Sequence, residues 1–356
     1  MGRLLSVAAV LVVAVGAVLF ARGDVPCEVV AVQPTCEVAL SPGPSEDTLE
    51  LVTITGADAF PPTSGELRLT TVAVQDDLTF GTWLSGRTSS IVEVVPRERI
   101  YPEGSDPDEV AELNAAAMAD SQLVAMIAAL EQMGYDLEPE GALVAGVTED
   151  AVTDELEVGD VIVAVDGEPV EESLDVVELV QARRPGEELV LEVRDDEGSR
   201  QVEVTLGESP DEPGTGFIGV FLTTELDLPV DIDIDAGVIG GPSAGMMFAL
   251  SIIELLEEGD LIDGRVVAGT GTLDRSGSVG AVGGVRQKLA AVTAGDEGPP
   301  ADVFLVPRDN LDDARQAPIT DEVLVVPIDT LDDAIAALEA LGDDRRPADA
   351  ELRAAS

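Results

Sequence analysis

One lysine stands out in this chain of 356 residues. Lys288 is the only lysine, because the other 18 basic residues are arginines, and there is no histidine. A buried lysine can lose its proton whereas arginine stays charged, so of the two only lysine can act as a general base. Ser243 lies 45 residues earlier in the run GGPSAG. The two residues predict a Ser-Lys dyad, in which a neutral amine activates a serine nucleophile. The alternative is a solvated surface lysine left over by a coding bias.

The composition excludes most other catalytic arrangements. Without histidine, the chain cannot form a Ser-His-Asp triad, a Cys-His pair, a His-ligated zinc site or an HExxH helix. Gln287 precedes the lysine and Leu289 follows it, so the Gly-Lys-Ser/Thr end of a Walker-type ATP site is absent. Valine at position 285 rules out the SxxK pattern. We therefore expect an enzyme that needs no ATP, no metal and no cofactor.

The segments around the two residues predict how they are positioned. Residues 277–284 are rich in glycine, and residues 285–293 then show helical spacing of apolar side chains, next to which Lys288 would be partly desolvated. A second helix is expected to begin at Ser243 and run to Leu256. Its free N-terminal amides would receive the oxyanion. The residues assigned to the oxyanion site and the substrate approach are Gly240, Gly241 and Ala244.

Several motifs occur in an order that resembles the proteolytic domain of Lon proteases. They are GGPSAG with its apolar helix, VAGTGTL at 267–273, GGVRQKL at 283–289 and VPRDN at 306–310. The resemblance implies that Ser243 is the nucleophile, Lys288 its general base and Thr270 a hydroxyl that positions the lysine. Gly240 stands where Lon proteases usually have aspartate, and Thr272 where they have glutamate. The best match is therefore the membrane-anchored Lon-like proteases with a PDZ domain, known from Gram-positive bacteria.

The region between the two halves of this domain has its own organisation. Strands are expected at 142–147 and 159–165, a helix at 173–182, and a hairpin from 187–194 to 200–206. The run LEVGDVIVAVDG at 156–167 resembles a PDZ domain of the bacterial protease type. Such domains add a peptide to a sheet edge and capture its C-terminal carboxylate. The resemblance places the carboxylate loop at Glu140, Gly141 and Ala142. A PDZ fold that only braces the protease domain is the alternative.

These observations predict an α+β protein, a Lon-type proteolytic domain interrupted by a PDZ domain and preceded by one N-terminal transmembrane helix. The expected parts are a signal anchor at 1–22, a linker at 23–44, the two halves of the proteolytic domain at 45–133 and 207–342, the PDZ domain at 135–206 and a tail at 343–356. Strands are expected at 49–55, 66–74 and 230–235, and a helix at 110–133. We expect strands 66–74 and 230–235 to share a sheet or a core, because they belong to one domain.

The N-terminus predicts the compartment. Residues 4–21 carry no charge over 18 positions, which is at the short end of what spans a bilayer as a helix. An uncleaved signal anchor is expected, with a cleaved signal peptide as the alternative. The two cysteines, Cys27 and Cys36, lie just beyond it. Their spacing suits a disulfide in an oxidising compartment, with two free thiols as the alternative. Both features predict a single-pass membrane protein whose bulk is extracytoplasmic.

Charge and hydrophobicity limit the partners. The net charge is −52, yet 45% of the residues are hydrophobic, so the chain can bury a core. Such a charge repels nucleic acid and anionic lipid headgroups. No EF-hand spacing is visible in the acidic stretches, so we interpret them as a solvated surface. The expected partners are polypeptide substrates, with exposed C-termini that bind the PDZ domain, and a membrane. A homo-oligomer is left open.

The sequence thus predicts an extracytoplasmic serine endopeptidase whose PDZ domain binds substrate or regulatory peptides. A non-catalytic PDZ adaptor built on a degenerate protease domain is one alternative, and it requires Lys288 to be exposed and far from Ser243. A Ser-Lys amidase or esterase of small substrates is another, because the dyad does not specify the acyl group.

Overall fold

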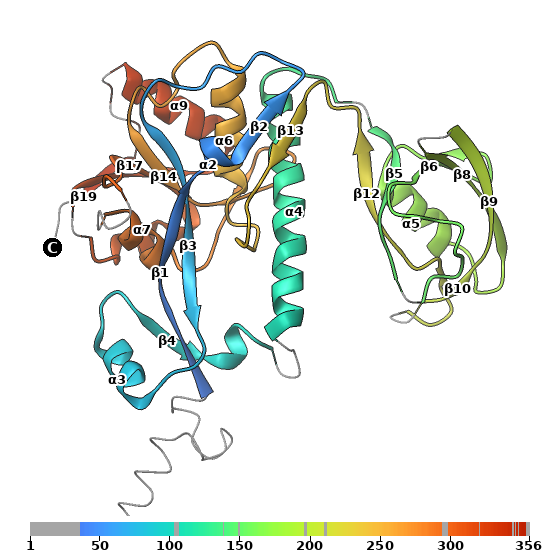
Figure 1. Ribbon diagram of the computed structural model, residues 1–356, viewed down its shortest axis with the longest axis horizontal. Coiled ribbons are helices and arrows are strands. Elements are labelled where there is room, and N and C mark those ends of the chain that lie inside the picture. The colour runs from blue at the N-terminus through green and yellow to red at the C-terminus, as the bar shows by residue number, and fades with distance from the viewer. Residues whose placement is uncertain are drawn as a thin grey trace, which may run out of the picture. The chain divides into compact units, whose positions relative to one another are not determined.

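The computed structural model describes residues 36–102, 107–137, 139–148, 150–195, 198–209, 212–293, 298–319, 321–343, 345, 347 and 349–353. The chain divides into two compact units (Figure 1). Unit 1 comprises the residues up to Gly134 together with those from Val230 onward, and unit 2 spans Tyr135–Pro229. The expected interruption of one domain by another is therefore present. The second join differs from the expected position at 207, because residues 207–229 belong to unit 2.

Unit 1 is built on a seven-stranded sheet in the order β19-β18-β17-β14-β3-β1-β4. Strands β3, β14, β17 and β18 are parallel to one another, whereas β1, β4 and β19 run antiparallel to their neighbours. The strands are β1 (Glu37–Asp47), β3 (Glu66–Gln75), β4 (Glu93–Pro96), β14 (Val266–Gly269), β17 (Val303–Pro307), β18 (Val323–Ile328) and β19 (Glu351–Arg353). Two short pairs accompany the sheet: β2 (Val52–Thr55) with β13 (Asp231–Ile234), and β15 (Thr272–Leu273) with β16 (Val279–Gly280).

Helices cover both faces of this sheet because the side chains of its parallel strands alternate between two apolar cores. One core takes Val267 and Leu305 from the strands and packs them against α4, α6 and α9. The other takes Ala268 and Phe304 and packs them against α7 and α8. The helices of unit 1 are α2 (Thr48–Leu51), α3 (Phe80–Thr88), α4 (Pro107–Gln132), α6 (Gly245–Leu256), α7 (Val285–Thr293), α8 (Leu311–Arg315) and α9 (Leu331–Gly342), with short 3-10 turns η2 (Arg97–Arg99) and η3 (Arg308–Asn310).

Most of the expected elements of unit 1 are present, with one correction. The predicted strand 49–55 is a helical turn, α2, followed by the short strand β2. Asp47 caps this turn by accepting a hydrogen bond from the amide of Leu49, which the alternating pattern did not reveal. Strand β13 pairs with β2 and not with β3, but Ile232 and Leu67 contribute to the same core. The two halves of unit 1 therefore fold together, as expected.

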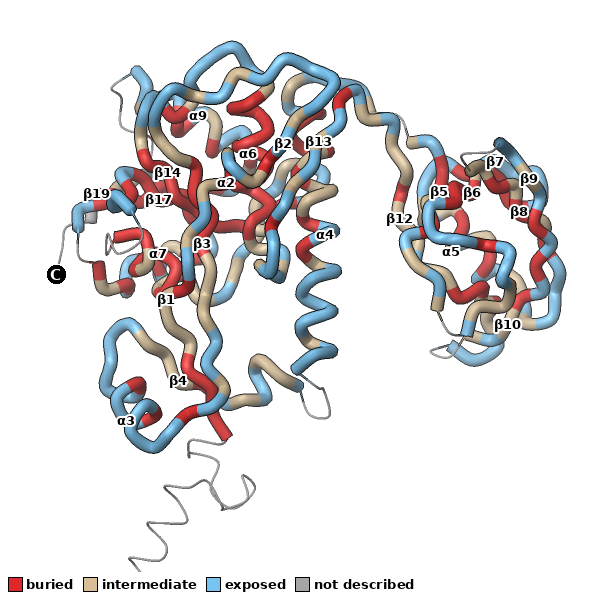
Figure 2. The backbone as a smooth tube through the Cα atoms, in the orientation of Figure 1, coloured by how far each residue is buried: buried red, intermediate tan, exposed pale blue. Residues whose placement is uncertain are grey.

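Helix α4 is the longest element of unit 1, and its C-terminal half is buried whereas its N-terminal half is exposed (Figure 2). Among the described residues it is the helix that is long and apolar enough to cross a membrane by length and composition. Ala125, Ala128 and Ala129 pack it into the core of unit 1. The predicted anchor at residues 4–21 lies outside the described residues.

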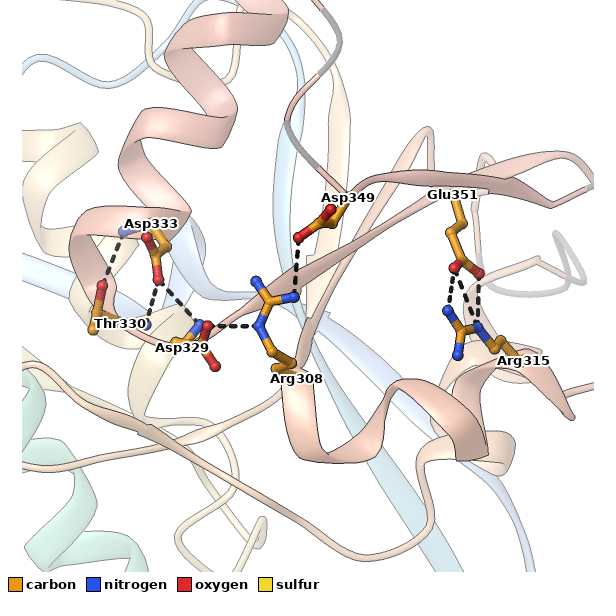
Figure 3. A network of polar contacts seen from close by, with 7 residues as sticks. All are labelled: Arg308, Arg315, Asp329, Thr330, Asp333, Asp349 and Glu351. Carbon is orange, nitrogen blue, oxygen red and sulfur yellow. Dashed lines mark hydrogen bonds and ion pairs between the residues drawn. The ribbon is translucent and has the colours of Figure 1, made fainter.

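Ion pairs connect η3 and α8 with the segments around β18 and β19 (Figure 3). Arg308 bonds Asp329 at 2.6 Å and Asp349 at 3.3 Å, while Arg315 contacts Glu351. Thr330 caps α9 in a capping box with Asp333. These groups are exposed, so each pair contributes little stability by itself.

Unit 2 is a six-stranded antiparallel sheet, in which five strands follow the order β12-β5-β6-β8-β9, with α5 packed on it. Its elements are β5 (Pro139–Val147), β6 (Val161–Val165), β7 (Glu168–Pro169), α5 (Ser173–Gln181), β8 (Glu188–Asp195), β9 (Gly198–Thr205), β10 (Gly207–Glu208), β11 (Gly216–Phe217) and β12 (Val220–Leu226). β7 joins the sheet beside β6. The strands, the helix and the hairpin expected at 142–206 are present. The sequence reasoning missed that β12 completes the sheet by pairing along β5.

Candidate active site

The serine motif lies in the turn between β13 and α6. Gly241 has a φ of +85°, which L side chains rarely adopt, and this conformation turns the chain sharply before the helix. The α6 helix begins at Gly245, with Ala244 as its N-cap residue. Ser243 therefore precedes the helix by two residues instead of starting it. The side chain of Ser243 is half-buried, whereas Gly240 and Pro242 are exposed, so a substrate can reach the hydroxyl from this side.

Helix α4 fixes this turn through two residues that the sequence reasoning missed. The backbone carbonyl of Asn114 accepts a hydrogen bond from the amide of Gly241 at 2.7 Å, and the hydroxyl of Ser121 donates to the carbonyl of Pro242 at 3.1 Å. A Cβ atom at Gly240 would lie 3.0 Å from the Cβ of Asn114. The available signal was positional: both residues lie on the side of α4 that carries the buried Met118, at helical spacing from it.

Lys288 reaches the site from α7, on the opposite face of the sheet. Val285, Leu289 and Val292 are buried on this helix, as expected, and the lysine itself is only 3% exposed. Its Nζ lies 2.7 Å from the Oγ of Ser243 and 2.8 Å from the Oγ1 of Thr270. The two residues expected to form a dyad are therefore within hydrogen-bonding distance.

Thr270 completes the contact from the carboxyl end of β14. Its hydroxyl donates to the backbone carbonyl of Ser243 at 3.0 Å, which leaves its oxygen available to accept from Lys288. The amide of Gly271 donates to the same carbonyl at 2.9 Å. The site thus lies just beyond the end of β14, where segments from the two faces of the sheet meet.

The electrostatic setting favours a neutral amine. Burial lowers the pKa of Lys288 to about 8, because the charged form loses its hydration. Within the described part of the chain, no carboxylate lies within ion-pair distance of its Nζ to oppose this shift. Lon proteases usually have acidic residues at the positions of Gly240 and Thr272. The absence of these two carboxylates is consistent with the low pKa of Lys288.

Two backbone amides beside the hydroxyl are free to bind an oxyanion. Those of Ser243 and Ala244 donate to no acceptor in the part of the chain that the structure describes. The amide of Gly241 bonds Asn114, so Gly241 does not serve as a donor and contributes only its backbone conformation. Gly240 has no comparable bond and leaves room at the exposed entrance.

The glycine-rich segment before Lys288 is held at both ends. The amide of Val279 donates to the carbonyl of Asp329, and Leu331 donates to the carbonyl of Gly277. Nearer the lysine, Asn310 accepts from the amide of Val282 at 2.8 Å and donates to its carbonyl at 3.1 Å. The asparagine of the VPRDN motif thus anchors the approach to α7, a role that the motif alone did not reveal.

In unit 2, the residues predicted to form the carboxylate loop lie within a strand. Glu140, Gly141 and Ala142 are part of β5, which has β12 on one side and β6 on the other. Gly141 faces β6 closely, since a Cβ there would lie 2.7 Å from the carbonyl oxygen of Ile162. With both edges of the strand paired, this segment cannot receive a further strand.

The free edge of this sheet beside α5 belongs to β12. It follows the run GFIG at 216–219, which has a φ of +86° at Gly219.

Cys36 is disulfide-bonded, and Cys27, the other cysteine of the sequence, lies outside the described residues. Among the described residues, no group of three or more histidine, cysteine, aspartate or glutamate side chains could hold a metal ion.

Comparison with protein families finds two domains. Residues 110–206 match the PDZ domain, and residues 224–340 match the C-terminal proteolytic domain of Lon protease (S16). The two matches correspond to the two units, although the first begins within α4 and the second within β12.

Similar individual proteins cover only parts of the chain. A probable periplasmic serine endoprotease DegP-like of Ectopseudomonas mendocina is 42% identical over 84 residues, which are 23% of this chain and 18% of that protein. Its counterpart in Pseudomonas putida F1 is 30% identical over 131 residues, 36% of this chain and 24% of that protein. The chain spans about a fifth of the length of these relatives. The PDZ domain of an SdrC-like protein from Listeria monocytogenes is 24% identical, covers 23% of this chain and 87% of that structure, and has a TM-score of 0.22.

Proposed function

The chain combines a PDZ domain with the C-terminal proteolytic domain of Lon proteases, and from this premise we propose that it is a serine endopeptidase working with a Ser-Lys dyad. The observation that carries the proposal is the 2.7 Å separation between the Nζ of Lys288 and the Oγ of Ser243, with the lysine buried and the serine accessible. No ATP and no metal enter the chemistry proposed here, because nucleophile, base and oxyanion donors all come from this chain.

In the acylation step, the neutral amine of Lys288 accepts the hydroxyl proton of Ser243 as its oxygen attacks the peptide carbonyl carbon. The carbonyl oxygen becomes an oxyanion and binds the free amides of Ser243 and Ala244. Thr270 accepts a hydrogen bond from the amine throughout the step. This bond keeps the lone pair of the amine directed at the serine.

The ammonium group of Lys288 then donates its proton to the leaving amine, so the peptide bond breaks and an acyl-serine forms. Water attacks the ester in the second half-reaction, with the same amine acting as base. A pKa near 8 suits both roles, because the group must gain and lose a proton in each cycle near neutral pH.

The PDZ unit supplies the peptide-binding part of the function. We place the peptide on the free edge of β12 beside α5, with its C-terminal carboxylate at residues 216–219. A peptide on this edge would raise the hydrogen exchange protection of residues 216–226, and amidation of its C-terminus would abolish the effect. Protection centred on residues 140–142 would instead support the loop expected from the sequence.

For the compartment, we propose that residues 4–21 anchor the chain in a membrane and that the bulk lies outside the cytoplasm. The disulfide at Cys36, which we assign to Cys27, supports an oxidising environment. The names of the DegP-like relatives, which describe them as periplasmic, agree with this location.

The observations favour this proposal over the alternatives. A non-catalytic adaptor requires Lys288 to be exposed and distant from Ser243, and it is neither. An amidase or esterase of small substrates would use the same dyad, but it gives no role to a peptide-binding unit.

A fluorophosphonate probe tests the nucleophile. We expect a single labelled residue, Ser243, and no label in Ser243→Ala, while the exposed Ser64→Ala keeps it. Lys288→Arg should lower casein cleavage by at least ~10³-fold, because arginine cannot give up its proton. Cleavage by Lys288→Arg near the rate of the unsubstituted protein would show that the lysine has a structural role only.

A further inference from the structure

A group of exposed apolar side chains lies at one end of unit 1, around α3 and β4. We call Val74, Phe80, Leu84 and Ile91 the α3 surface; their exposed fractions are 41%, 37%, 49% and 36%. Phe80 and Leu84 are four residues apart on α3 and so share a face of that helix. Such a group of large exposed apolar side chains on one small substructure marks an interaction site.

The substructure beneath this surface is thin, so folding alone does not bury these side chains. Its core consists of Ala39, Leu78 and Trp83, with Val92 and Val94 packed beside them. The indole N–H of Trp83 donates to Glu37 at 2.6 Å, and its ring stacks on Phe80 with centroids 5.7 Å apart. The tryptophan thus fixes the outer apolar layer on the first residues of β1.

The charge of this region differs from that of the whole chain. Residues 74–101, which hold the α3 surface, carry three arginines, at positions 87, 97 and 99, and four acidic residues, at 76, 77, 93 and 98, whereas the chain has a net charge of −52. The same 28 residues contain the only tryptophan and one of the two tyrosines. Aromatic side chains combined with arginine are typical of segments that lie in the interface of a lipid bilayer.

The position of the surface in the chain points to the same partner. Figure 1 shows α3 and β4 at the end of unit 1 where β1 begins, and Glu37 pairs with Pro96 of β4. In the disulfide proposed above, Cys36 at this end of unit 1 is bonded to Cys27. Cys27 in turn follows Ala21, the last residue of the apolar segment, by six residues. Six residues reach at most about 20 Å, and a disulfide adds about 6 Å between Cα atoms.

We propose that the α3 surface rests on the outer leaflet of the membrane in which residues 4–21 are anchored. Phe80 and Leu84 enter the boundary between headgroups and acyl chains, while Arg97 and Arg99, which pair with Asp76 and Glu93, remain at the headgroup level. The contact orients unit 1 on the bilayer and keeps its strongly acidic remainder away from anionic lipid. This inference goes beyond the proteolytic function and does not depend on the chemistry at Ser243.

Trp83 makes the test direct, because it is the only fluorophore of its kind in the chain. The full chain is inserted into vesicles of phosphatidylcholine with one fifth phosphatidylglycerol, with bromines placed at different depths along the acyl chains. We expect bromines near the headgroup to reduce the Trp83 emission about twofold, and bromines near the bilayer centre to have less effect. Unchanged emission in every brominated vesicle, or failure of the chain to float with the vesicles, would overturn the proposal.

The double variant Leu84→Asp/Ile91→Asp separates the surface contact from the anchor. It should still float with the vesicles and cleave casein normally, but lose the quenching. The matched control is Val158→Asp in unit 2, where a valine is 67% exposed, and it should be quenched like the unsubstituted chain. If the double variant instead turns a dimer into a monomer in detergent, and the unsubstituted chain is not quenched, the surface binds a second copy of the chain and the membrane contact is refuted.

Discussion

The buried amine of Lys288 should cost the protein stability near neutral pH, and Lys288→Met should recover it. Burial lowers the pKa of this lysine from 10.5 to about 8, so the folded chain binds fewer protons than the unfolded chain between these values. Stability therefore rises with pH across this window, and the cost is fully present below pH 8. The full shift corresponds to about 3 kcal/mol.

The methionine variant removes this cost with a side chain of similar length. Thr270 and Ser243 then lose the hydrogen bonds they share with the amine, which offsets about 1 kcal/mol of the gain. We expect Lys288→Met to be more stable than the unsubstituted protein by about 2 kcal/mol at pH 7 and to be inactive. Lys288→Arg is the control and should be less stable, because its buried guanidinium cannot become neutral.

The measurement is urea unfolding of the unsubstituted protein and of Lys288→Met between pH 7 and 10.5, with circular dichroism as the readout. The difference between the two should shrink as the pH rises through 8 and then become small or reverse. A Lys288→Met chain that is less stable than the unsubstituted protein at pH 7, or a difference that does not change with pH, would refute the reasoning.

Three further predictions concern Lys288, Glu254 and Asn310. The kcat/KM for a peptide substrate should rise with pH to a plateau, with a midpoint near the Lys288 pKa of about 8, because the neutral amine is the active form; a profile flat from pH 6 to 9 would contradict this. Burial raises the pKa of Glu254 to about 7, so the folded chain loses stability as the pH rises from 4.5 to 7. In urea unfolding, Glu254→Gln should therefore increase the free energy of unfolding by about 1–3 kcal/mol at pH 8 and leave it unchanged at pH 4. Asn310→Leu removes both bonds to Val282, so kcat should fall at least ~10-fold while KM changes little, and an unchanged kcat would show that the segment before Lys288 does not need this anchor.

The residue types in the sequence limited the chemistry. The lack of histidine and the single lysine left few bases for Ser243, and the order of the motifs pointed to the Lon proteolytic domain. The strands and helices near the site could be predicted because their apolar side chains follow simple periods, as in α7 and β3. The interruption of unit 1 was also visible in the sequence, since the PDZ-like pattern separates two segments that each need the other to bury their apolar faces.

Only the tertiary structure decided which groups meet. It brings Ser243 and Lys288 from opposite faces of a sheet to the end of β14, and no local pattern encodes that 2.7 Å contact. It also showed that Asn114 and Asn310 position the two segments, because hydrogen bonds to backbone atoms leave no periodic signal. Strand order, finally, depends on pairing between distant segments. β12 follows the rest of unit 2 in sequence but lies at the sheet edge beside α5. For this reason we propose residues 216–219 as the peptide-binding loop, in place of the residues 140–142 expected from the sequence.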